Sequence, residues 1–175
     1  MKLTRTGKYH LSQGVIPKLK NNYYNKQGIL KPIGLWYSIG SRWLDFKLNE
    51  NWNNNGIRKK GTEYYINKPL TMYSIKFFNC KYTTTPNKAK VLLLDTQTKL
   101  TKFNTKYSNK REGGYFIGWE KVSQDYAGIE FRNYSRIKKE LENKNSFILW
   151  YSALDVDSGC VWNPSTVVKK IDKMT

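Results

Sequence analysis

The sequence predicts an α+β fold, formed by a single domain that spans residues 1–175. A length of 175 residues suits one domain with a sizeable core. An aromatic content of 15% is too high for a disordered chain. Short runs of β-branched and aromatic residues alternate with two or three helical patterns, which favours a sheet with a few short helices.

The N-terminal segment is predicted to begin with a strand followed by a loop. Lys8–Ser12 is the expected strand, with His10 at its centre. Val15–Asn25 contains a proline and paired asparagines, both unfavourable in a helix interior, so it is expected to be a turn and a loop.

A strand, a helix and a loop are expected next. Ile33–Ile39 is a short apolar run between turn signals, which predicts a buried strand. Ser41–Asn51 is predicted to be a helix with Ser41 as its N-cap. Trp52–Gly61 is polar and rich in asparagine, which predicts a loop.

The rest of the chain is expected to be dominated by strands, because β-branched and aromatic residues recur in short runs. The predicted strands are Glu63–Ile66, Leu70–Asn79, Ala89–Asp95, Gly128–Phe131, Ser146–Trp150 and Cys160–Trp162. Pro164 is expected to end the last of them.

Two further helical segments are predicted among these strands. The first follows the strand at Ala89–Asp95, with Thr96 or Thr98 as its cap, because Leu100, Phe103 and Tyr107 recur at helical spacing. The second, Trp119–Tyr126, is expected to be a short helix or a turn.

The composition is strongly basic, with a net charge of +18. Such a field attracts polyanions or an anionic surface. Most of the positive residues are Lys, and Asn is abundant; AT-rich codons favour both, so part of the charge can reflect genomic bias. The N-terminus is polar from its start, so we expect a soluble, cytoplasmic protein without a membrane span.

Several kinds of site are disfavoured by the motif content. Cys80 and Cys160 lack CxxC spacing and a histidine cluster, so no metal site is expected, while a bridge between them stays open. Neither GxGxxG nor a P-loop motif occurs. Asp155 and Asp157 in LDVDSG would share a face of a strand, but the segment is more typical of a tight turn.

Glu130 stands out because it lies inside an apolar run, between Ile129 and Phe131. If this run is a strand, the two apolar residues share one face and Glu130 takes the other. A carboxylate in a strand interior is costly to bury without a partner. Two interpretations therefore stay open: the second face lies in solvent, or it lines a cleft in which Glu130 is the functional acid.

Three segments occur in a suggestive order: His10, then KPIGLWYS at Lys31–Ser38, then GIE ending at Glu130. This order resembles the His–Tyr/Ser–Glu arrangement of the ADP-ribosyltransferase superfamily, of the diphtheria-toxin and poly(ADP-ribose)-polymerase type. Over nearly its full length the chain also resembles a group of bacterial and phage proteins. That group shares a KPxGLW-S segment, a strand running into Asp-Thr (VLLLDTQTKL), a Tyr-x-Gly-Ile segment and an ending like WYSALDVDSGCVWNP.

The resemblance implies a split antiparallel β-sheet whose cleft binds NAD in a bent shape. Glu130 would be the catalytic residue, accepting a hydrogen bond from the nicotinamide-ribose 2′-hydroxyl and stabilising the positive charge that develops as nicotinamide leaves. His10 would hold the adenosine ribose and the nicotinamide amide. The NAD-binding residues implied in this way are His10, Ser12, Gly34, Leu35, Trp36, Tyr37, Ser38, Ser41 and Trp43.

Two assignments within this site stay open. Either Tyr37 or Trp43 would stack on the nicotinamide ring, and either Ser38 or Ser41 would be the hydroxyl partner. Arginine is disfavoured as the acceptor, because arginine-modifying relatives carry Gln or Glu at the position that is Gly128 here.

The function expected on these grounds is mono-ADP-ribosyl transfer from NAD to a macromolecule, with nucleic acid slightly favoured over protein because of the charge. One alternative is a non-enzymatic module that binds single-stranded nucleic acid through the Tyr- and Lys-rich stretch KLKNNYYNK. Another is an NAD glycohydrolase toxin with the same site. We expect a monomeric phage or viral protein that makes no membrane contact.

Overall fold

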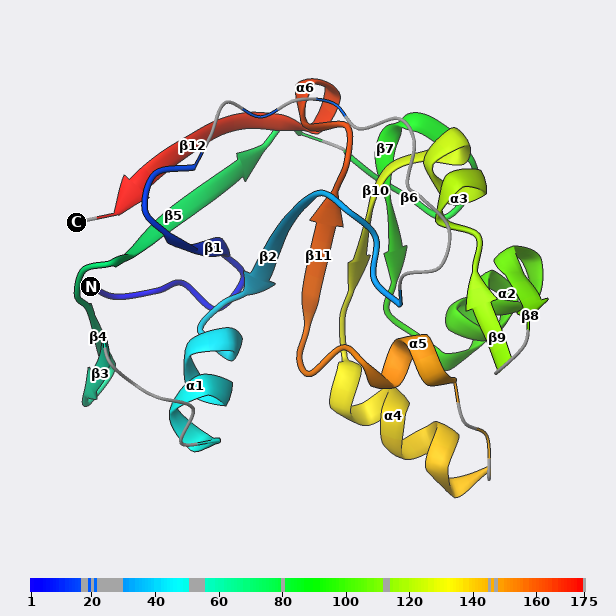
Figure 1. Cartoon of the computed structure of the whole chain (residues 1–175), viewed down its shortest axis with the longest axis horizontal. Helices are drawn as coiled ribbons and strands as arrows, with labels where there is room; N and C mark the ends of the chain where they lie inside the picture. Colours follow the sequence, from blue (N-terminus) through cyan, green and yellow to red (C-terminus); the bar gives the residue numbers. More distant parts are fainter. Residues whose placement is uncertain are drawn as a thin grey trace.

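The computed structural model shows an α+β fold, as predicted, built on one eight-stranded sheet that is flanked by helices (Figure 1). The residues that it describes are 1–16, 19, 21, 30–50, 56–79, 81–111, 114–144, 146 and 148–174. Within these residues no helix has both the length and the apolar character needed to cross a membrane.

The large sheet has the strand order β12-β5-β1-β2-β11-β10-β7-β6. Its strands are β1 (Lys8–Gln13), β2 (Leu35–Ile39), β5 (Leu70–Phe77), β6 (Tyr82–Thr83), β7 (Asn87–Leu94), β10 (Tyr126–Phe131), β11 (Ser158–Val161) and β12 (Val168–Met174). Neighbouring strands are antiparallel except for β10 with β7 and β7 with β6, which are parallel. The sheet is therefore continuous and mixed, whereas the resemblance implied a split antiparallel one.

Two small hairpins and six helices complete the described part of the chain. The hairpins pair β3 (Ile57–Lys60) with β4 (Glu63–Ile66) and β8 (Ser108–Arg111) with β9 (Gly114–Ile117). The helices are α1 (Arg42–Asn49), α2 (Gln97–Tyr107), α3 (Trp119–Asp125), α4 (Tyr134–Asn143), α5 (Leu149–Ser152) and α6 (Pro164–Val167).

The sheet is curled, so that its two ends approach each other. The ring centroid of Phe77 on β5 lies 6.3 Å from that of Tyr82 on β6, although six strand positions separate these strands. In a flat sheet that separation would be roughly 29 Å, at about 4.8 Å per strand. We call the face that carries both rings the inner face and the opposite one the outer face.

Apolar side chains bury both faces of the sheet. On the inner face, Leu35, Tyr37, Val91 and Val161 belong to one core cluster. Two groups of elements cover the outer face. The β3–β4 hairpin and α1 pack over β1 and β5, while α2 to α5 pack over β7 and β10 around a large aromatic cluster.

Most of the predicted strands are confirmed, and so are the three predicted helices, which correspond to α1, α2 and α3. The helix α2 begins after Thr96, whose side chain accepts a hydrogen bond from the Lys99 amide, and it buries the three residues that predicted it. Ser41 precedes α1 as predicted, but its hydroxyl donates to the Asp45 carboxylate and makes no backbone cap.

Two predicted elements are wrong. The expected loop Trp52–Gly61 contains β3, whose pairing with β4 overrides its polar sequence; residues 52–55 lie outside the described part. The predicted strand Ser146–Trp150 overlaps the short helix α5, whose Trp150 and Tyr151 both pack into the aromatic cluster on the outer face. The strand predicted at Cys160–Trp162 does end before Pro164, which begins α6, but the strand β12 that follows and pairs with β5 was not predicted.

The segment LDVDSG bends from α5 into β11 and is not a strand that carries both aspartates on one face; its Asp157 has a structural role. Asp157 is buried, and its Oδ1 accepts a hydrogen bond of 2.8 Å from the Tyr134 amide at the start of α4. Its Oδ2 lies 3.3 Å from the Arg42 guanidinium. Asp157 therefore joins α4 to α1, while Asp155 is exposed.

Candidate active site

Glu130 is the most deeply buried charged residue of the described chain, with 0% of its surface exposed. Its Oε2 accepts hydrogen bonds from the Tyr37 hydroxyl at 2.8 Å and from the Tyr82 hydroxyl at 2.7 Å. Its Oε1 accepts one from Arg132 Nε at 2.6 Å. These donors hold both carboxylate oxygens in one fixed orientation on the inner face.

A glycine makes the Tyr37 contact possible. Tyr37 on β2 lies opposite Gly159 on β11, which in turn lies opposite Glu130 on β10. A Cβ atom at Gly159 would stand 2.3 Å from both Cζ and Oη of Tyr37. The missing side chain therefore leaves the space through which the phenol crosses β11 to reach the carboxylate.

Cations and aromatic rings complete the surroundings of Glu130. Lys8 Nζ lies 3.9 Å from Oε2, and it sits over the rings of Phe77 and Tyr82 at 4.9 and 5.4 Å. The guanidinium of Arg132 also lies over Tyr82, at 5.1 Å. We call Lys8, Tyr37, Phe77, Tyr82, Glu130 and Arg132 the Glu130 cluster; it pairs one carboxylate with two cations.

The pKa shifts in this cluster keep the two phenols and the guanidinium protonated. Burial, and then the charge of Glu130, raise the pKa values of Tyr37 and Tyr82. Burial lowers the pKa of Lys8, and the nearby Glu130 charge only partly opposes this effect. Burial alone would lower the pKa of Arg132, but Glu130 raises it overall. At neutral pH the phenols and the guanidinium are therefore hydrogen-bond donors.

His10 is half-buried on β1 and shares the inner face with this cluster. Lys8 and His10 are two residues apart on one strand, so their side chains point to the same side. The β1–β2 register, continued by one residue, places His10 opposite Tyr37. The structure thus brings His10, Tyr37 and Glu130 onto one face of three strands, in the order in which the resemblance predicts a site.

The hydrogen bond of His10 fixes its tautomer. Its Nδ1 lies 2.7 Å from the carbonyl oxygen of Trp36, which can only accept, so Nδ1 carries a proton. Burial lowers the pKa of His10, and the carbonyl partly opposes that shift. The neutral ring therefore presents Nε2 as an acceptor to a further partner.

The other residues of the predicted NAD wall divide between the two faces. Leu35 shares the inner face with Tyr37, and Ser12 shares it with His10. Gly34 is exposed just before β2, and a Cβ there would stand 2.6 Å from the Val161 carbonyl oxygen. Trp36 points to the outer face and packs on the cluster under α2 to α5.

The predicted serines and Trp43 also lie away from Glu130. Ser38 is buried on the outer face, and its hydroxyl donates to the Gly40 carbonyl. Ser41 binds Asp45 at the start of α1, while Trp43 lies on α1 beside the same pocket as Trp36. Of the two predicted aromatic residues, it is Tyr37 that the structure brings to Glu130.

Four members of the cluster were not predicted from the sequence: Lys8, Phe77, Tyr82 and Arg132. The sequence gives a weak indication for two of them, because Arg132 lies two residues after Glu130 and Lys8 lies two residues before His10, on or next to the same strand. It gives no indication for Tyr82, because only the curl of the sheet brings β6 to the inner face. Among the described residues, no group of three or more His, Cys, Asp or Glu could hold a metal ion.

Cys160 lies on the face of the sheet opposite to this site. Cys160 is buried on the outer face, where burial raises the pKa of its thiol well above the usual value. Its Sγ lies 3.8 Å from the Pro32 carbonyl. Cys80 lies outside the described residues, so the pairing of the two stays open.

Comparison with known proteins adds no family or relative to these observations. No protein-family model, no curated protein and no solved structure matches the chain. Its function must therefore be inferred from the Glu130 cluster and from the strands that hold it.

Proposed function

We propose that the protein is an NAD-dependent mono-ADP-ribosyltransferase with Glu130 as its catalytic carboxylate. One observation carries the proposal: a fully buried carboxylate, oriented by two phenols and a guanidinium, shares a face with His10 and Tyr37. Burying a charged carboxylate carries a desolvation penalty that can exceed the stabilisation from its partners, so its presence here favours a functional role. The same proposal takes the inner face of the curled, continuous sheet as the NAD-binding surface.

The proposed chemistry needs one fixed negative charge. Breaking the bond between nicotinamide and ribose develops positive charge on the ribose, and a preorganised carboxylate stabilises that state. Tyr37 and Tyr82 act as positioning residues, because they hold Oε2. His10, through Nε2, accepts a hydrogen bond from a ribose hydroxyl.

Movement of the Arg132 side chain would give a substrate access to Glu130. Its side chain is 39% exposed, so it is the most solvent-accessible partner of the carboxylate. When it swings away from Oε1, that oxygen becomes free to accept the ribose 2′-hydroxyl. The displaced guanidinium and Lys8 then suit the pyrophosphate, since guanidinium and ammonium groups bind phosphate oxygens well.

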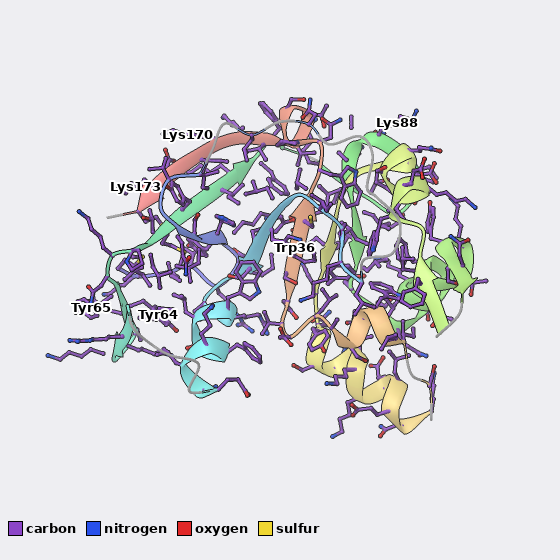
Figure 2. All side chains as sticks on the ribbon, viewed as in Figure 1. Trp36, Tyr64, Tyr65, Lys88, Lys170 and Lys173 are labelled. Atoms are coloured by element: carbon purple, nitrogen blue, oxygen red, sulfur yellow. The ribbon has the colours of Figure 1, made fainter. Side chains whose placement is uncertain are left out.

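The acceptor is proposed to be nucleic acid rather than an arginine side chain. At Gly128 a Cβ atom would stand 2.6 Å from the Cys160 carbonyl oxygen, so this position cannot carry the Gln or Glu of arginine-modifying relatives. Exposed lysines lie on opposite sides of the molecule, Lys170 and Lys173 on β12 and Lys88 on β7 (Figure 2). Together with the net charge of +18, these lysines favour a polyanionic acceptor.

Nicotinamide release tests the proposal. The protein is incubated with NAD alone, and then with DNA, RNA or a protein lysate. Release that needs a macromolecule supports transfer, whereas release from NAD alone supports a glycohydrolase with the same site. Glu130→Gln should abolish release in either case, and Glu140→Gln, at an exposed position on α4, should not. No release by the wild-type protein under any condition would refute an NAD-dependent enzyme.

The non-enzymatic alternative has one structural observation in its favour. On the β3–β4 hairpin the exposed Arg58 lies directly opposite the exposed Tyr65, a pairing that suits phosphate and base together. The stretch first predicted for this role, KLKNNYYNK, falls largely outside the described residues. Binding of single strands without any nicotinamide release would favour this alternative.

A further inference from the structure

A pocket of about 260 Å³ opens on the outer face of the sheet. It lies between the two groups of elements that cover this face, α1 with the β3–β4 hairpin and α2 to α5. It is lined by Lys31, Trp36, Trp43, Leu154, Asp155 and Ser158, and we call it the tryptophan pocket. Trp43 comes from α1 on one side, Leu154 and Asp155 follow α5 on the other, and Trp36 and Ser158 form part of the sheet between them (Figures 1 and 2).

The aromatic wall of this pocket is held in place. Trp36 Nε1 donates a hydrogen bond of 3.0 Å to the Pro32 carbonyl, which fixes the plane of the indole. Lys31 Nζ lies 6.0 Å from the centre of the Trp36 ring. A flat ligand would therefore meet a preformed aromatic surface with a cation at its border.

Ser158 brings a hydroxyl group to the pocket. The residue is 2% exposed and lines the pocket wall, so a ligand in the pocket lies next to this hydroxyl. A hydroxyl can both donate and accept a hydrogen bond. Asp155 adds an acceptor and Lys31 adds a donor at the same pocket.

We propose that the tryptophan pocket binds a nucleobase. A flat heteroaromatic ring would stack on indole, and its ring nitrogens and exocyclic groups would pair with Ser158 and Asp155. A cationic ligand is disfavoured because Lys31 already lies by Trp36. The volume is below the range of about 300–1,000 Å³ for drug-sized ligands, which suits a single base.

The pocket is separate from the Glu130 cluster. Trp36 and Tyr37 are consecutive on β2, so their side chains lie on opposite faces of the sheet. The pocket would therefore bind its base whether or not Glu130 is catalytic. The base can belong to a free nucleotide or to a single-stranded nucleic acid, and the net charge of +18 attracts the phosphate of either.

Calorimetric titration at near-physiological salt tests this site, with AMP, GMP, CMP and UMP as free nucleotides and short single-stranded DNA and RNA as polymers. Trp43→Ala should weaken binding roughly tenfold, since stacking dominates such sites. Ser158→Ala, a small change at a buried position, should weaken it several-fold and alter the preference among bases. Circular dichroism and thermal unfolding check that both variants fold.

Two controls separate this proposal from the others. Tyr65→Ala removes an exposed aromatic ring from β4 and should leave binding unchanged, and so should Glu140→Gln on α4. Binding of free nucleotides and binding of polymers alone both support the pocket and identify the source of the base. Absence of binding would overturn the proposal. The proposal would also be overturned if Trp43→Ala and Ser158→Ala both left the affinity for nucleotides unchanged, or if Tyr65→Ala removed that affinity instead.

Discussion

Replacing Tyr37 by phenylalanine should destabilise the protein by removing one donor from a buried carboxylate. The lost bond is 2.8 Å long and ends on Glu130 Oε2, which has no exposure to water. A hydrogen bond to a charged group contributes about 1.5–3 kcal/mol. Oε2 keeps Tyr82, with Lys8 nearby, so we expect a loss near the lower part of that range, about 2 kcal/mol.

Urea unfolding followed by fluorescence and circular dichroism measures this loss in the free energy of unfolding. In thermal unfolding, a chain of 175 residues should show a fall in Tm of roughly 4–8 °C for a loss of about 2 kcal/mol. Tyr65→Phe is the matched control, because its hydroxyl bonds Glu63 at an exposed site and should change stability by less than about 0.5 kcal/mol.

A double-mutant cycle decides whether the loss comes from the bond to Glu130. Tyr37→Phe is measured in the wild-type protein and in Glu130→Gln, and the difference gives the coupling between the two side chains. We expect a coupling of about 1 kcal/mol or more. A coupling near zero, or a Tyr37→Phe loss no larger than that of Tyr65→Phe, would refute the view that the phenol holds the carboxylate.

Three further predictions test the neighbourhood of the cluster. Gly159→Ala should cost about 1–3 kcal/mol in urea unfolding, because its Cβ would collide with the buried Tyr37 ring; an unchanged stability would show that the ring can move. Asp157→Asn should lower Tm by removing the charge that faces Arg42 and the start of α4, and equal Tm values would contradict this role. His10 has a lowered pKa in the folded protein, so the unfolded chain binds a proton first as pH falls below about 6.5, and stability is then lost. His10→Asn should flatten that loss between about pH 6.5 and 5, and parallel curves for both proteins would contradict the shift.

The position of Glu130 illustrates what the sequence could predict. Its place between two apolar residues predicted a strand with a carboxylate on the second face, and the structure confirms that strand. Local pattern could not decide whether that face was solvent or interior. The answer depends on β11, β2 and β6, which come from distant parts of the chain, and on the curl that brings Tyr82 over the sheet.

For the NAD-binding residues predicted on and before β2, the local pattern was already informative. Strand alternation already required Trp36 and Tyr37 to face opposite ways, so the consecutive residues Gly34–Ser38 could not all line one site. What the sequence could not say was which of the two faced Glu130. That choice follows from the β2–β11–β10 register and from the space that Gly159 leaves for a phenol.

The two proposed sites lie on opposite faces of the same two strands, which restricts how they can cooperate. Tyr37 and Gly159 support Glu130 on the inner face, while Trp36 and Ser158 line the tryptophan pocket on the outer face. A sheet with its side chains is about 10 Å thick, so a base held by the tryptophans cannot reach the carboxylate through it. If nucleic acid is the acceptor, the bound base is therefore an anchor, and a different nucleotide must receive the ADP-ribose after the strand has passed around an edge of the sheet.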